Sequence, residues 1–226
     1  MHFFQLLKSL DELLYEVMSW LVFYPITLWR TVRHPMRMMA YAGAQQADDV
    51  QAPYGDTLSP PIFLLLTVLF AHGVELAAVG ESSIVADTRG LAGLVSDDTS
   101  LIVMRLIAFS VFPVVVASSF VRRTGRKLDR DTLERPFYAQ CYATAPYALA
   151  FSLAATLSQM DWAWGQPATA AMVGVATLGW LALQTVWFTR QLATGPIRGF
   201  IYALWAYVQC LAVLVVLAWL MGGEGF

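Results

Sequence analysis

Five apolar segments dominate the chain and restrict what it can fold into. They cover approximately residues 61–79, 101–121, 137–159, 168–189 and 200–221. Each is long enough to cross the hydrocarbon core of a bilayer, which is about 30 Å thick. Only 13% of the 226 residues are charged and the mean hydropathy is +0.58, whereas about a quarter of a soluble domain is charged. The sequence therefore predicts an all-α, polytopic membrane protein with five transmembrane helices.

Basic residues are concentrated in every second connection between these segments, and therefore on one side of the predicted membrane. The part before the first span has four, and the loop after it has one against four acidic residues. The run Arg122–Arg135 has six basic and three acidic residues, and the next loop has Asp161 and no basic residue. Arg190 and Arg198 follow the fourth span, and the tail carries only Glu224. By the positive-inside rule, we expect a multi-pass protein of the cytoplasmic (inner) membrane, with its N-terminus inside and its C-terminus outside.

The sequence divides into three parts, of which only the last is membrane-spanning. Residues 1–41 form an amphipathic and basic cytoplasmic arm, 42–60 a linker rich in small residues, and 61–226 the membrane domain. Over residues 3–24, apolar side chains recur at helical spacing opposite a charged face, and Pro25 is expected to end this pattern. Such a helix can lie in the membrane interface or pack on the spans of the protein itself. The sequence leaves both alternatives open.

Two basic groups form a candidate cytoplasmic face for lipid or a partner. They are Arg30, Arg33 and Arg37 in the arm, and Arg122, Arg123, Arg126 and Lys127 after the second span. Near an anionic membrane surface, each such residue contributes about 1 kcal/mol. The second group lacks interleaved aromatic residues, so nucleic-acid binding is not expected. Within the same run, Asp131 and Glu134 fit a capping box for the third span. Fixing the topology is its first predicted role.

Three ionisable residues fall inside the predicted spans. His72 and Glu75 are three residues apart on the first span, and Arg105 lies at a similar depth on the second. A Glu75–Arg105 ion pair would allow both charges to be kept in a bilayer. The three residues form a candidate intramembrane polar site, which could bind a proton or ion beside a cavity. Alternatively, the pair links two helices and has no further role.

Other site chemistry is not indicated. No His, Cys, Asp or Glu cluster has the spacing of a metal site, and no catalytic Ser/His or paired-carboxylate pattern is present. There is no glycine-rich phosphate loop. Cys141 and Cys210 fall within apolar segments and are interpreted as buried thiols. We therefore expect no cofactor, no metal and no enzymatic activity.

Several motif residues lie where a known family has its own. Tyr54-Gly55 precedes the first span, and Tyr138, Tyr142 and Pro146 lie in a tyrosine-rich opening of the third. With the arm and five clustered spans, the chain resembles the Yip-domain family, Ypt/Rab-interacting-protein-like membrane proteins, in its prokaryotic form. The resemblance implies a non-enzymatic membrane protein. Eukaryotic relatives act in vesicle traffic and in binding small GTPases or other partners, whereas prokaryotic ones are of unassigned or loosely transport-related role.

Two functional hypotheses follow from the sequence. In the first, the protein is a scaffold whose cytoplasmic face binds anionic lipids together with a membrane-protein partner or a second copy of the chain. In the second, it is a transporter or permease component that uses His72, Glu75 and Arg105. Because five spans are few for a complete carrier, the second hypothesis also requires a dimer or a partner subunit.

Overall fold

The computed structural model describes residues 2–45, 56–80, 98–160 and 162–221. Within these ranges the fold is all-α, as predicted, with no strand. The helices are α1 (His2–Arg33), α2 (Pro35–Gln45), α3 (Pro60–Val79), α5 (Asp98–Arg123), α6 (Arg130–Gln159), α7 (Gly165–Gln191) and α8 (Pro196–Met221). Each predicted span falls inside one of them. The predicted linker 42–60 begins inside α2, and its residues 46–55 lie outside the described ranges.

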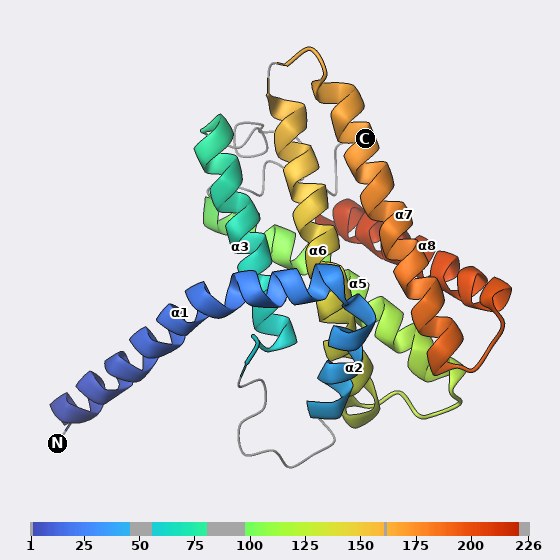
Figure 1. Cartoon of the computed structure of the whole chain (residues 1–226), viewed down its shortest axis with the longest axis horizontal. Helices are drawn as coiled ribbons and strands as arrows, with labels where there is room; N and C mark the ends of the chain where they lie inside the picture. The colour runs from blue at the N-terminus through green and yellow to red at the C-terminus, as the bar shows by residue number, and fades with distance from the viewer. Residues whose placement is uncertain (1, 46–55, 81–97, 161, 222–226) are drawn as a thin grey trace.

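Four helices, α3, α5, α7 and α8, are long and apolar enough to cross a membrane, which indicates a multi-pass, membrane-embedded protein. α6, which contains the predicted third span, falls short of this hydropathy criterion. It packs against α2, α3, α5 and α7 and lies among them in Figure 1. Its polar residues Gln140, Thr144 and Ser152 are buried. A helix covered by other helices does not need an apolar surface, and this explains its lower hydropathy.

α1 does not end at Pro25, so the predicted interruption there is wrong. The helix continues through Pro25 to Arg33, although an interior proline costs about 3 kcal/mol or more. Packing of the second half of α1 offsets this cost. Thr27 and Thr31 are buried, and the ring of Tyr24 lies 5.7 Å from that of Phe63 on α3. The first half of α1 projects away from the other helices (Figure 1).

The start of α6 also differs from the prediction. The helix begins at Arg130, and its capping box joins Asp129 and Thr132, so the predicted box of Asp131 and Glu134 is wrong. The backbone N–H of Thr132 donates to Asp129 Oδ1 at 2.9 Å, and that of Asp129 donates to Thr132 Oγ1 at 3.2 Å. These bonds fix the α6 end of the basic run. They also hold the pKa of Asp129 below its ordinary value.

A glycine allows α7 and α8 to approach closely. A Cβ atom at Gly199 on α8 would overlap Thr189 Oγ1 and would lie 2.8 Å from the carbonyl oxygen of Thr185. Both are closer than van der Waals contact permits, and the second partner is backbone. Only glycine therefore fits at this position without displacement of α7.

Candidate functional site

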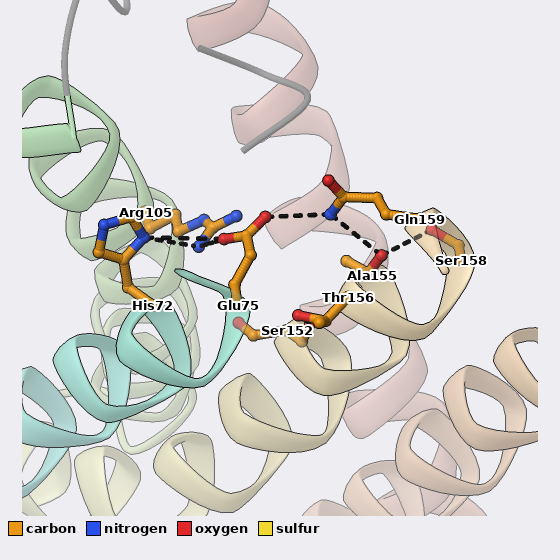
Figure 2. A network of polar contacts seen from close by, with 8 residues as sticks. All are labelled: His72, Glu75, Arg105, Ser152, Ala155, Thr156, Ser158 and Gln159. Atoms are coloured by element: carbon orange, nitrogen blue, oxygen red, sulfur yellow. Dashed lines mark hydrogen bonds and ion pairs between the residues drawn. The ribbon is translucent and has the colours of Figure 1, made fainter. Parts of the chain in front are cut away.

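The predicted polar residues of the spans come together in the structure. Glu75 Oε2 on α3 accepts a hydrogen bond from Arg105 on α5 at 2.5 Å. His72 lies one turn before Glu75, with its Nδ1 atom 3.7 Å from Glu75 Oε2 and 3.4 Å from the Arg105 guanidinium. The side chains of Glu75, His72 and Arg105 are 1%, 5% and 12% exposed. Figure 2 shows the three side chains converging between α3 and α5.

A fourth residue, Gln159, completes this network and was missed by the sequence analysis. It is the last residue of α6, and its Nε2 atom donates to Glu75 Oε1 at 3.0 Å and to the carbonyl oxygen of Ala155 at 3.3 Å (Figure 2). Its depth in the membrane could have indicated this contact, since the predicted topology places the end of the third span level with Glu75. Both carboxylate oxygens of Glu75 thus accept hydrogen bonds, and the two donors, Arg105 and Gln159, lie on different helices.

The network joins three helices through a buried carboxylate whose charge is compensated. Opposite charge and two donors stabilise the ionised form of a carboxylate that burial would otherwise destabilise. Neither Glu75 nor Arg105 lines any of three pockets found among the described residues. Among the residues in the described ranges, no three His, Cys, Asp or Glu side chains are placed to hold a metal ion. The geometry favours an interhelical link.

A second polar cluster ties the arm to the segment before α3. Arg30 on α1 forms an ion pair with Asp56 at 2.7 Å, and Tyr41 on α2 donates to the other carboxylate oxygen at 3.0 Å. The hydrogen bond from Arg30 lowers the pKa of Asp56, and that from Tyr41 lowers it further. The candidate residue Arg30 is therefore engaged within the protein.

The residues of the family-like motif differ in their location and burial. Tyr54 and Gly55 lie outside the described ranges. Tyr142 is fully buried on α6 and its hydroxyl donates to the carbonyl oxygen of Leu58 at 2.6 Å. Tyr138 is half-buried, and Pro146 lines an apolar pocket of about 230 Å³ between α1, α6 and α7. The Tyr142 hydroxyl thus links the segment before α3 to α6.

The remaining candidate basic residues are mostly exposed. Arg123 lies over the ring of Tyr202 on α8 at 4.1 Å, and Arg33 lies over Trp29 at 5.6 Å. The exposed members of the two groups are Arg33, Arg37, Arg122, Arg126 and Lys127. Five of the seven predicted basic residues can therefore reach an external anion.

A buried amide pair, also missed by the sequence analysis, joins α6 and α7. Gln140 on α6 and Gln184 on α7 are fully buried and exchange two hydrogen bonds, of 3.1 Å and 2.6 Å. Each amide satisfies the other, so the pair links the two helices without charge.

Comparison with protein-family models, curated proteins and solved structures finds no match to this chain. The resemblance to the Yip-domain family remains a prediction from motif and architecture.

Proposed function

We propose that the protein spans the cytoplasmic membrane five times, with α6 as the third span and the N-terminus inside. We further propose that it is a non-enzymatic scaffold of Yip type, whose cytoplasmic face binds membrane lipid and a membrane-protein partner or a second copy. The bundle of α3, α5, α6, α7 and α8 holds this face in place. The face itself consists of α1, α2 and the basic run after α5.

The observation that carries this proposal is an uncovered apolar stripe along α1. The stripe consists of Leu14, Met18, Leu21, Val22, Trp29 and Val32, each more than half exposed. At 3.6 residues per turn, these six positions fall within an arc of about 100° and so share one helix face. Burying one large apolar side chain contributes about 1.5–3 kcal/mol. Leaving six in water would cost on the order of 10 kcal/mol, so the stripe needs a cover.

The interface of a membrane supplies such a cover. The exposed charged residues Lys8, Glu12 and Glu16 recur four residues apart on a different face from the stripe, as in helices that lie in the interfacial plane. In Figure 1, α1 crosses α3 and α6 instead of running alongside them. A helix that crosses the spans can lie in the plane of the membrane while the spans pass through it. This supports a lipid-embedded arm.

The polar network supports a scaffold over a transporter. Both oxygens of Glu75 are hydrogen-bonded, to Arg105 and to Gln159, and Glu75 is not among the lining residues of the three pockets considered in the described part of the chain. A carrier site needs room for its cargo and a group that can exchange partners. The link between α3, α5 and α6 offers rigidity to the bundle, as a scaffold requires.

Spin labels on α1 test the proposal. Leu14→Cys and Leu21→Cys probe the stripe, and Glu12→Cys and Glu16→Cys serve as matched controls on the polar face. The buried Cys141 and Cys210 are replaced by alanine in every variant, and the purified protein is reconstituted into vesicles containing anionic lipid. We expect labels at 14 and 21 to be accessible to oxygen and shielded from a water-soluble nickel chelate. Labels at 12 and 16 should show the reverse. Equal chelate access at all four positions would refute an interfacial arm.

A further inference from the structure

A cavity of about 890 Å³ opens where four helices meet. Its lining includes residues of α2, the end of α5, the first turns of α6 and the end of α7. In the proposed topology, these ends lie at the cytoplasmic headgroup level. Pockets that bind small ligands have volumes of roughly 300–1,000 Å³, so the cavity can hold a phospholipid headgroup together with its glycerol.

The lining of this cavity is divided by polarity. Met39, Val121, Ala139 and Trp187 line it as buried apolar side chains. The exposed residues Arg126, Asp131 and Arg135 also line it. A cavity with an apolar interior and a charged entrance fits a molecule that has both characters, as a membrane lipid does.

The two arginines at the entrance are available to a ligand. Neither Arg126 nor Arg135 forms an ion pair with an acidic residue in the described part of the chain. Gly125 has a φ of 71°, a conformation that glycine adopts readily, and it turns the chain after α5 just before Arg126. Arg135 lies four residues after Asp131 on α6 and so on the same helix face. Two cations and one carboxylate therefore surround one opening.

We propose that this cavity binds a membrane phospholipid, with its phosphate held by Arg126 and Arg135. Guanidinium groups bind phosphate through strong, often bidentate hydrogen bonds, and basic pockets between membrane helices on the cytoplasmic side bind lipid headgroups. Asp131 adds a preference for a headgroup that carries an amine, because its carboxylate repels a purely anionic headgroup and attracts an ammonium. The glycerol end lies against Trp187 and Val121. This inference rests on the proposed function only in that the topology brings headgroups to the cavity.

The test uses purified, lipid-depleted full-length protein in mild detergent. Native mass spectrometry measures binding of phosphatidylethanolamine and phosphatidylglycerol, with soluble phosphoethanolamine and inorganic phosphate as competitors. The wild-type protein should bind phosphatidylethanolamine more tightly than phosphatidylglycerol. Arg126→Gln with Arg135→Gln should weaken lipid binding about tenfold or more, since two charge-assisted contacts are lost. The matched control, Arg190→Gln with Arg198→Gln, removes two exposed arginines outside the cavity and should bind as the wild type does.

Three results would overturn the inference. Equal lipid binding by the wild type and the Arg126/Arg135 variant would remove the phosphate assignment. An unchanged headgroup preference in Asp131→Asn would remove the ammonium assignment. Complete displacement of lipid by an equal concentration of phosphoethanolamine or phosphate would identify a site for a free phosphate compound instead.

The two proposals can fail separately, because α1 contributes no residue to the lining of this cavity. If the spin labels lie in the interface but lipid binding does not depend on Arg126 and Arg135, the cavity site alone is refuted. Labels in water together with arginine-dependent lipid binding would refute the interfacial arm alone.

Discussion

Replacing Arg105 by methionine should destabilise the protein strongly, because it leaves the carboxylate of Glu75 buried without its cation. The side chain of Glu75 is 1% exposed, and removing one partner of a buried ion pair costs about 3–5 kcal/mol. Gln159 would still donate to Glu75. We therefore expect a loss at the lower end of this range, about 3 kcal/mol.

The reverse change should cost less. Glu75→Gln leaves Arg105, whose side chain is 12% exposed and whose long stem allows its charge to reach water. A loss of about 1–2 kcal/mol is expected. The double variant, Glu75→Gln with Arg105→Met, contains neither charge and should lie within about 1–2 kcal/mol of the wild type. Its loss should thus be smaller than the sum of the two single losses, by about 2–4 kcal/mol.

The assay is the free energy of unfolding in mixed micelles, measured for all four proteins by helical circular dichroism as the fraction of denaturing detergent rises. Arg198→Met is the control, since Arg198 is exposed and a surface change is worth about 0.5 kcal/mol or less. A double variant whose loss equals the sum of the single losses would refute the interhelical link. A Glu75→Gln protein of unchanged stability that loses an ion flux in reconstituted vesicles would establish a transport site instead.

Two further predictions concern the packing of α8 and the attachment of the arm. Gly199→Ala should cost about 1–3 kcal/mol in the same unfolding assay, because the new Cβ would overlap Thr189 on α7. Gly174→Ala, whose Cβ would meet nothing within 4 Å, is the control, and equal stability of the two variants would contradict the close approach. The pKa of Asp56 is held below its ordinary value of 3.8 by Arg30, so this ion pair stabilises the fold fully above pH 3.8 and less as the pH falls through the lowered pKa. Asp56→Asn should therefore reduce the loss of stability below pH 3.8, and an acid response identical to that of the wild type would count against the ion pair.

The sequence predicted most of the helices and part of the polar network, for identifiable reasons. Long apolar runs and their charged ends marked α3, α5, α7 and α8. The similar depth of Glu75 and Arg105 in two successive spans was enough to predict their ion pair. Gln159 was missed because glutamine residues are mostly solvent-exposed, so one at a helix end gives no signal of a buried contact. The Gln140–Gln184 pair was missed because the rotation of α6 relative to α7 determines whether the two amides face each other. No short motif encodes that rotation.

Other differences came from tertiary contacts that override local signals. Pro25 breaks an isolated helix, but packing around Tyr24 and Thr27 keeps α1 continuous. Asp131 with Glu134 matched a capping pattern, yet Asp129 and Thr132 form the box two residues earlier. Gly199 carried no sequence signal, since only the approach of α7 makes glycine necessary there.

The central claim is that α6 crosses the membrane as the third of five spans, and the two ends of this helix test it most directly. Lys127→Cys and Trp162→Cys place single thiols just before and just after α6, in protein whose buried Cys141 and Cys210 have been replaced by alanine. A membrane-impermeant maleimide is applied to right-side-out and to inverted vesicles. We expect the thiol at 162 to react only in right-side-out vesicles and the thiol at 127 only in inverted ones. Reaction of both thiols from the same side would contradict the claim.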